Sequence, residues 1–295
     1  MKLDELLAEY LLQLEADGRS SHTVRQAERH GKLLAAFLGE REVGDVMHQD
    51  VARFLTSAMA LRTPDGRAKK PASANALRSS IRCLFAFAHA AGYVGANPAR
   101  LVRRARCGSP PPRALSDADR ERLVRALDGA ATDAERRDRA LFRLLLGAGL
   151  RLGSALALDI GDLDLEAGEV RLRTMKNAEQ DVAFVAEDVV AILREHVGAR
   201  TEGAVFVGEH GGRVGARQAH RRLAWWARRA GIERSVHPHA LRHTFGMAVY
   251  EASGDLLVTK RALCHRSANA TAIYARAIPH RVRDAVRASS TRTGL

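Results

Sequence analysis

Residues 162–174, DLDLEAGEVRLRT, interrupt a chain whose other segments mostly have a helical pattern. Apolar and polar residues alternate along this stretch, and a period of two is typical of strands with one buried face. Ala167 and Gly168 break the alternation and predict a tight turn. Residues 181–185, DVAFV, form a third candidate strand. The stretch therefore predicts a small antiparallel sheet inside an otherwise helical domain.

The first third of the chain has the apolar spacing of amphipathic helices. Helices are expected near residues 3–14, 20–38, 51–58 and 72–91. Ser20 or Ser21 can cap the second of them. In the last, Arg78 and Arg82 lie on a different side from the apolar residues. These segments predict a four-helix unit over residues 1–107.

A proline-rich segment separates this unit from the rest of the chain. Residues 103–116, RRARCGSPPPRALS, contain three consecutive prolines and no periodic pattern, which is typical of a semi-rigid linker. We place the linker at residues 108–113 and a second domain at residues 114–295, opened by a helix capped by Ser116 and Asp119. Its further helices are expected at about 134–147 and from about residues 187, 217, 238, 255 and 280. The expected fold class is mainly α in two domains, one helical and one α+β with a small antiparallel sheet.

Basic residues dominate the chain, which carries a formal net charge of +13. Residues 66–116 hold ten Lys or Arg and no acid, and residues 213–243 hold eight Arg against the single acid Glu233. Such surfaces attract polyanions, and phosphate contacts supply much of the affinity for nucleic acids. We therefore predict a nucleic acid as partner, contacted by Lys69, Lys70, Arg78, Arg82, Arg103, Arg104, Arg221 and Arg222. Of the neighbouring Trp225 and Trp226, one is expected to pack in the core, and base stacking by the other stays open.

Composition excludes several other classes of protein. The three cysteines are few, odd in number and not in metal-type pairs, so we expect a reducing compartment and no disulfide framework. No apolar run reaches the length of a membrane span. The first ten residues form an amphipathic pattern with acids rather than a secretion signal. The sequence predicts a cytoplasmic protein without a membrane segment.

The side chains that could carry chemistry are spread over the second domain. His239 and Arg242 follow Pro238, which favours the first turn of a helix, so both lie on one face at a helix N-terminus. Backbone N–H groups, the helix dipole and a guanidinium all favour an anion there. The other candidates are an arginine at a glycine-rich helix break, a lysine at a turn between strands, and a histidine and a tyrosine nine residues apart: Arg151, Lys176, His265 and Tyr274. No carboxylate pair accompanies them, so the set predicts phosphoryl transfer by positioned cations without a cofactor.

Other roles for neighbouring residues compete with this interpretation. His239 and His243 have a spacing that zinc ligands use on a helix, but Arg242 would repel a cation, and we expect no metal site. His243 is expected to pack or hydrogen-bond near the site. Tyr250 is a second hydroxyl without a histidine at the same spacing, and we expect it in the core. Cys264 is expected to be a small buried residue rather than a nucleophile.

In chain order, GLRLGSALALDIGDLDL, MKN, HPHALRHTF and LCHRSANATAIYAR resemble the motifs of the tyrosine recombinases, the phage-integrase and Xer-like family. The family pattern is an Arg after a Gly-rich break, a Lys in a β-hairpin, His-x-x-Arg, a His or Trp, and a Tyr nine residues further on. The six candidates match these positions in order. Residues 1–107 are similar to the family's helical, SAM-like core-binding domain, and residues 114–295 to its catalytic domain, which has the DNA breaking-rejoining enzyme fold.

The resemblance implies a metal-free transesterification on double-stranded DNA. Tyr274 would attack a phosphodiester, form a 3′-phosphotyrosyl bond and release a 5′-hydroxyl. The implied roles of the others are phosphate binding for Arg151, Arg242 and His265, protonation of the leaving oxygen for Lys176, and assistance to proton transfer at the nucleophile for His239. Such enzymes usually act as four protomers on two duplexes, with a C-terminal segment docked on a neighbour. Residues 278–289, IPHRVRDAVRAS, have a narrow apolar face that fits this docking.

Three positions depart from the family pattern. Ser154 stands where an acid is common, Cys264 where a glycine is usual, and Asp181 where a basic residue often follows the lysine. The six reacting positions are all present, so we expect a site-specific recombinase or integrase. Two alternatives remain: a catalytically weakened member that acts as a DNA-binding protein, and topoisomerase-like strand relaxation.

Overall fold

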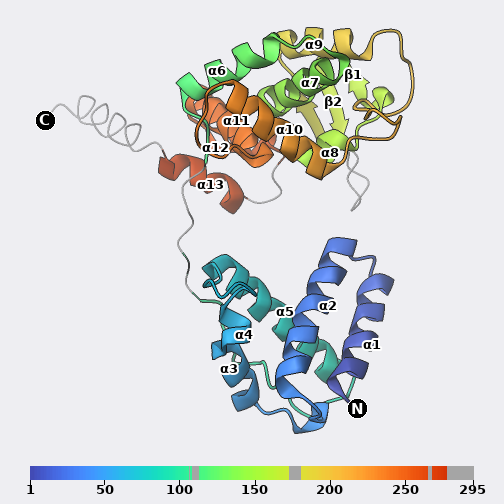
Figure 1. Cartoon of the computed structure of the whole chain (residues 1–295), viewed down its shortest axis with the longest axis vertical. Helices are drawn as coiled ribbons and strands as arrows, with labels where there is room; N and C mark the ends of the chain where they lie inside the picture. Colours follow the sequence, from blue (N-terminus) through green and yellow to red (C-terminus); the bar gives the residue numbers. More distant parts are fainter. Residues whose placement is uncertain (106, 108–112, 173–180, 265–267, 278–295) are drawn as a thin grey trace, which may run out of the picture. The chain divides into compact units, whose positions relative to one another are not determined.

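The chain folds into two compact units, Met1–Gly108 and Ser109–Leu295, each with its own hydrophobic core. The computed structural model describes residues 1–105, 107, 113–172, 181–264 and 268–277 (Figure 1). The first unit is helical, and the second combines helices with a small antiparallel sheet. The expected mainly helical fold class is confirmed. The division falls at the start of the expected linker, whose residues 108–112 lie outside the described residues.

Amphipathic helices build the first unit around an apolar centre. Its α-helices are α1 (Leu3–Ala16), α2 (Ser21–Leu38), α3 (His48–Thr56), α4 (Ala58–Leu61) and α5 (Pro71–Ala90). Ser20 caps α2 and accepts a hydrogen bond from the amide of Thr23 at 3.2 Å. The short helix α4 was not expected; the Ser57 side chain starts it by accepting from the amide of Ala60 at 3.4 Å. In α5, Ile81 and Phe85 are fully buried while Arg82 is exposed, as the apolar spacing predicts.

Both ends of the linker are fastened to the unit they adjoin. The buried Asn75 of α5 donates to the carbonyl of Ala105 at 2.9 Å and accepts from its amide at 2.8 Å. In the second unit, the amide of Leu115 donates to the hydroxyl of Thr244 at 2.8 Å. These hydrogen bonds leave residues 106–114 between the two anchors.

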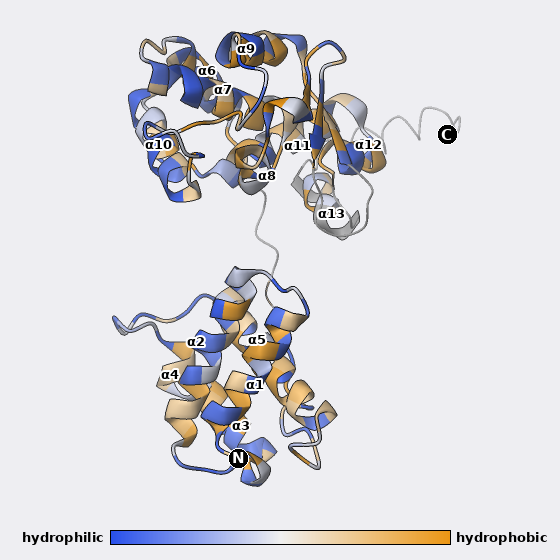
Figure 2. Cartoon of the chain, turned by 90° about the vertical axis from the view of Figure 1, so that its right-hand side faces the viewer, coloured by the Kyte–Doolittle hydropathy of each residue, from blue (hydrophilic) through white to orange (hydrophobic). Residues whose placement is uncertain are grey.

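Helices make up most of the second unit. They are α6 (Asp117–Asp128), α7 (Asp133–Ala148), α8 (Leu152–Leu156), α9 (Glu187–Val197), α10 (Ala216–Arg229), α11 (Pro238–Ser253), α12 (Leu256–Ala262) and α13 (Ala268–Ala277). Helix α7 is central and packs against α9 and α11, with Leu141, Phe142, Leu144 and Leu145 buried. By contrast, many hydrophilic residues lie along α6 and α10 (Figure 2). The helix expected near residue 280 lies outside the described residues.

The predicted sheet is present as β1 (Leu163–Asp164), β2 (Glu169–Leu172) and β3 (Asp181–Phe184), in antiparallel order β1-β2-β3. Gly168 supplies the turn with φ of +67°. The first strand is shorter than the alternation predicts because Asp162 belongs to the preceding 3-10 helix (Ile160–Asp162). Its carboxylate accepts from the amide of Asp159 at 2.9 Å, which caps that turn and removes Asp162 from the strand.

Candidate active site

A sharp turn at the end of α7 presents the first arginine of the predicted set. Gly149 ends the helix in the left-handed conformation, with φ of +61°. A β-carbon there would lie 2.2 Å from Cδ1 of Phe245, so the position requires glycine. Arg151 then stands at the N-cap of α8 and is exposed. The turn therefore places a solvent-accessible guanidinium at the start of a helix.

The second arginine of the predicted set is buried. Arg242, in the second turn of α11, is 3% exposed and donates to the carbonyls of Gly149 at 2.5 Å and Leu263 at 2.7 Å. Burial and the nearby charge of Arg151 lower its pKa to about 10. It therefore stays charged at neutral pH. Its guanidinium ties the turn after α7 to the end of α12.

Tyr274 of α13 occupies a slot on the surface of α11. Its ring is 1% exposed and lies over Gly246, where a β-carbon would stand 2.6 Å from the ring atom Cζ. Its hydroxyl lies 3.1 Å from Nδ1 of His243. Burial raises the pKa of this hydroxyl, and the charge of Arg242 partly opposes the rise. The hydroxyl therefore carries its proton at neutral pH and is buried with the imidazole of His243 as a polar partner.

Two histidines on α11 connect the tyrosine to the helix N-terminus. The rings of His239 and His243 meet edge to face, with centroids 4.4 Å apart. Burial is the main cause that lowers the pKa of His243 to about 4, and the neighbouring His239 and Arg242 lower it further. This ring is therefore neutral. The predicted position of His243 near the site is confirmed, and it is the histidine that contacts Tyr274. The exposed His239 lies one turn closer to the helix N-terminus.

Four of the six predicted residues thus come together. The charge of Arg151 is close enough to lower the pKa values of both His239 and Arg242. The charge of Arg242 in turn lowers the pKa of Tyr274. Lys176 and His265 lie outside the described residues. In the sequence, Lys176 stands between β2 and β3, and His265 directly follows Cys264. The charges of Arg242 and Arg151 also act on the Cys264 thiol, whose pKa they lower against the effect of burial. A tyrosine hydroxyl can attack a phosphate whose charge neighbouring guanidinium groups neutralise.

A family model matches the part of the chain that contains this site. Residues 113–281, more than half of the sequence, match the phage integrase family. The chain belongs to the phage integrase family. It is a tyrosine-type site-specific recombinase that acts on DNA, an enzyme class that breaks and rejoins strands. The resemblance that the ordered motifs indicated is confirmed.

Similar proteins extend the match over both units of the recombinase. Tyrosine recombinase XerC of Chromobacterium violaceum is 30% identical over 276 residues, covering 92% of this chain and 90% of that protein. XerC of Xylella fastidiosa is 34% identical over 263 residues, covering 87% and 86%. Among solved structures, XerH bound to a palindromic difH substrate has a TM-score of 0.72 at 19% identity, covering 94% and 84%. A lambda integrase dimer bound to a COC′ core site has 0.70 at 18%, covering 91% and 96%. These two structures show that the fold is shared.

The three positions that depart from the family pattern all lie near the described site. Ser154 is half-buried in α8, and Asp181 opens β3. Cys264 is the only non-glycine residue among those described with a positive φ, +49°. Its thiol lies 3.7 Å from the carbonyl of Val182, and burial raises its pKa. Cys264, expected to be a small buried residue, is instead half-buried, and its positive φ strains the backbone.

We predict that Cys264→Gly is more stable than Cys264→Ala by about 1 kcal/mol, because both lose the thiol but only glycine adopts a positive φ without steric cost. Urea denaturation of the two variants beside the wild type measures the difference. Equal stabilities would show that this backbone conformation carries no strain.

The predicted DNA-contacting residues are in different environments. Arg82, Lys70, Arg103, Arg104 and Arg221 are exposed, and none of the ion pairs found among the described residues includes them or Arg78. The ammonium of Lys69 donates to the carbonyl of Met59 at 3.1 Å. Arg222 pairs with the buried carboxylate of Asp138 and lies 4.5 Å from the ring centre of Trp225. Arg222 is therefore engaged within the catalytic unit.

The two tryptophans of α10 have different roles in packing. Trp226 is fully buried and donates from Nε1 to Asp138 at 3.1 Å. Trp225 is half-buried, with Arg222 over its ring at 4.5 Å and Arg229 at 5.3 Å. One ring packs in the core, as expected. Tyr250, which we expected in the core, is instead half-buried on α11, because it lies on the side of the helix away from the central core cluster.

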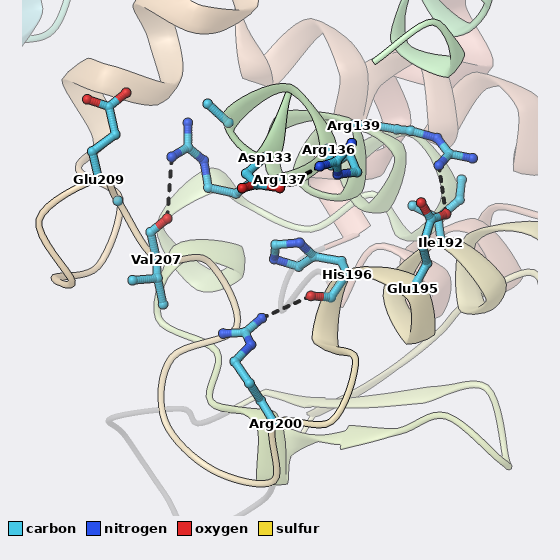
Figure 3. Close-up of a pocket in the computed structure, with 12 residues that line it drawn as sticks. Asp133, Arg136, Arg137, Arg139, Ile192, Glu195, His196, Arg200, Val207 and Glu209 are labelled. Carbon is cyan, nitrogen blue, oxygen red and sulfur yellow. Dashed lines mark hydrogen bonds and ion pairs between the residues drawn. The ribbon is translucent and has the colours of Figure 1, made fainter. Parts of the chain in front are cut away.

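A cavity of about 480 Å³ near the N-terminal end of α7 is a different site (Figure 3). Four arginines line it, and each has a partner within the unit. Arg137 donates to the carbonyl of Val207 at 3.3 Å and Arg139 to Glu195 at 2.9 Å. Arg200 donates to the carbonyl of His196 at 3.2 Å, and Arg136 pairs with Asp133. Arg151 follows the opposite end of α7, a helix roughly 24 Å long. The arginines of this cavity therefore belong to the scaffold.

Within the described ranges, no cluster of three or more His, Cys, Asp or Glu side chains has the arrangement of a metal site. The same part of the chain has no helix long and apolar enough to cross a membrane.

Proposed function

We propose that this recombinase cuts and rejoins double-stranded DNA at specific sites through a 3′-phosphotyrosine intermediate at Tyr274, without a metal or cofactor. The observation that carries the proposal is the packing of Tyr274 on α11, with its hydroxyl 3.1 Å from Nδ1 of His243, the residue after Arg242. Arg151 and His239 lie within the same electrostatic neighbourhood. This arrangement supplies a nucleophile and two cations for one phosphate.

The proposed cleavage step balances without any external reagent. The Tyr274 oxygen bonds to phosphorus, and the bond from phosphorus to the 5′-oxygen breaks. Arg151 and Arg242 hold the non-bridging oxygens together with His265, and Lys176 gives a proton to the leaving oxygen. The tyrosyl phosphodiester conserves the energy of the broken bond, so a 5′-hydroxyl from a second strand can attack it and release Tyr274.

The proton of Tyr274 requires an acceptor other than its hydrogen-bond partner. The pKa of His243 is lowered to about 4, whereas that of Tyr274 is raised above its ordinary value near 10. This difference disfavours transfer to His243, which we take as the hydrogen-bond acceptor that orients the hydroxyl. We assign the proton transfer to His239, which is exposed next to His243 and is neutral, since burial, then Arg242 and Arg151, lower its pKa.

We further propose that the active assembly is a tetramer on two duplexes, formed in the cytoplasm, with residues 278–289 docked on a neighbouring protomer. The XerH and lambda integrase structures contain DNA, and the latter is a dimer, which supports an oligomer on DNA. The proposed phosphate contacts are the exposed basic residues Lys70, Arg82, Arg103, Arg104 and Arg221. The other three predicted contacts, Lys69, Arg78 and Arg222, are half-buried, and we assign them a smaller part in DNA binding.

Covalent capture tests this function without a preselected target sequence. The protein is incubated in EDTA with fragmented genomic DNA of its source organism, denatured with detergent, and the attached fragments are sequenced. We expect covalent fragments that share one sequence, and a nicked duplex of that sequence should then trap the complex. Tight DNA binding without any covalent fragment would support a non-catalytic DNA-binding protein. Attachment without sequence preference, together with relaxation of supercoiled plasmid, would support a topoisomerase-like activity.

A further inference from the structure

Helix α8, which carries Arg151 at its N-cap, is a single turn of five residues. A helix this short is not stable by its own hydrogen bonds, so tertiary contacts must hold it. Its residues Ala155 and Leu156, and Leu158 beyond it, are buried in the central core. The last carbonyls of a helix have no partner within it and need a donor from elsewhere. The position of Arg151 depends on what supplies that donor.

Arg213, from the loop before α10, is the donor. One nitrogen of its guanidinium, Nη1, donates to the carbonyls of Leu158 at 2.9 Å and Leu156 at 3.3 Å. The other, Nη2, pairs with the carboxylate of Asp159. A planar guanidinium can serve these three acceptors together, which an ammonium cannot do with the same geometry. Arg213 therefore fixes the C-terminal end of the helix that begins at Arg151.

The loop that carries Arg213 is itself held in place. Val207 and Arg213 form an antiparallel bridge, and the amide of Val214 donates to the carbonyl of Phe206 at 3.1 Å. The amide of Val205 donates to the carbonyl of Leu158 at 3.0 Å, so the same loop is joined to the exit of α8 by backbone bonds as well. Arg213 thus extends from a fixed backbone rather than from a free loop.

The attachment by Arg213 opposes the electrostatic repulsion between Arg151 and Arg242. Arg151 and Arg242 carry like charges close enough that Arg151 lowers the pKa of Arg242. Without a phosphate between them, these charges repel each other. Arg242 is fixed by two carbonyls, so the repulsion acts mainly on Arg151 and the short helix behind it. A rigid attachment at the C-terminal end of α8 keeps the Arg151 guanidinium in its phosphate-binding position before DNA is bound.

We propose that Arg213 is a positioning residue for Arg151: it fixes the C-terminal end of α8 and so sets where the first phosphate-binding guanidinium stands. This inference rests on the proposed role of Arg151 in cleavage. Arg213 lies in the basic stretch of residues 213–243, yet its guanidinium is used inside the catalytic unit. It does not touch the DNA in this assignment and is not a catalytic residue.

The test compares Arg213→Ala with Arg200→Ala in the full-length chain. Arg200 donates to the carbonyl of His196 at the end of α9 at 3.2 Å (Figure 3). It also donates to the carbonyl of Ala204 in the same loop at 3.1 Å, and none of its hydrogen bonds among the described residues reaches α8. It therefore controls for general loosening of the loop. The substrate is DNA of the sequence that the wild type captures. The rate constant for covalent attachment is measured at a saturating concentration of this DNA, and the DNA dissociation constant is measured separately. Arg213→Lys serves as the conservative variant.

We expect Arg213→Ala to slow attachment about 10- to 100-fold with little change in DNA affinity, because displacement of a phosphate-binding group by about 1 Å has effects of this size. Arg200→Ala should match the wild type, and Arg213→Lys should fall between. On a substrate whose scissile phosphate is a neutral methylphosphonate, the defect of Arg213→Ala should shrink, as should that of Arg151→Ala, because less charge needs to be neutralised. Equal rates for Arg213→Ala and the wild type, or an equal defect in Arg200→Ala, would overturn the proposal.

Hydrogen exchange separates this inference from the proposed function. In the DNA-free protein, amides of α8 should exchange faster in Arg213→Ala than in Arg200→Ala or the wild type. If the wild type forms no covalent complex, the proposed function fails, and the exchange of α8 still decides whether Arg213 holds it. Unchanged exchange in Arg213→Ala would overturn the assignment, whatever the enzyme does with DNA.

Discussion

Tyr274→Phe should abolish covalent attachment to DNA, a loss of roughly 10⁴-fold or more, because the variant lacks the oxygen that bonds to phosphorus. Its ring can still fill the slot over Gly246, so the fold should be retained. The lost hydrogen bond to His243 should cost only about 1 kcal/mol of unfolding free energy. Detergent-resistant protein–DNA complexes, quantified beside DNA binding by the folded variant, measure the effect.

Tyr250→Phe is the matched control for this substitution. Tyr250 is the other tyrosine of the catalytic unit and is half-buried on α11, the helix against which Tyr274 packs. Removal of its hydroxyl should leave attachment at the wild-type level. Persistent attachment in Tyr274→Phe, with loss in Tyr250→Phe, would reverse the assignment of the nucleophile.

Arg242→Ala should have the second largest effect, acting on both stability and chemistry. The carbonyls of Gly149 and Leu263 would lose their donor in a buried position, which should lower the unfolding free energy by about 3 kcal/mol. Loss of one cation from the phosphate site should slow attachment by a further ~10²- to 10³-fold. Chemical denaturation and single-turnover attachment, both at a temperature where the variant is folded, separate the two losses.

Arg137→Ala shows which part of that loss is due to unfolding. Arg137 is 5% exposed, similar to Arg242, and it bonds to the carbonyl of Val207 and to Asp138 at the other end of α7. Its removal should destabilise the catalytic unit by a comparable amount, since it breaks a buried ion pair. Attachment per folded molecule should remain near the wild-type rate. A similar slowing in both variants would mean that Arg242 acts only through stability.

Much of the fold could be predicted because local patterns determine it. The alternation in residues 162–174, the turn at Gly168 and the apolar face of α5 each depend on near neighbours in the sequence. The exceptions are places where a side chain forms a hydrogen bond with a nearby backbone amide and so changes the local secondary structure. Asp162 caps a 3-10 turn instead of extending β1, and the Ser57 side chain starts the additional helix α4.

The site was predictable in its residues more than in its contacts. The ordered motifs identified the reacting positions, but the bond between His243 and Tyr274 joins residues 31 apart in the chain, and no periodicity predicts it. The same holds for arginines in the basic stretch. Arg213 and Arg222 have the sequence context of DNA-contacting residues, yet both have acidic or carbonyl partners far away in the sequence.

The attachment site itself is the most direct test of the proposed chemistry. Trypsin and nuclease digestion of the covalent complex leaves a nucleotide on one peptide, which mass spectrometry identifies. Tyr274 lies in the tryptic peptide of residues 267–276 and Tyr250 in that of residues 243–260, so the two are distinguishable. We expect a 3′-linked nucleotide on residues 267–276 alone, with a free 5′-hydroxyl on the other DNA end. A nucleotide on another peptide, or a 5′-linkage, would contradict the assignment of Tyr274 as the nucleophile.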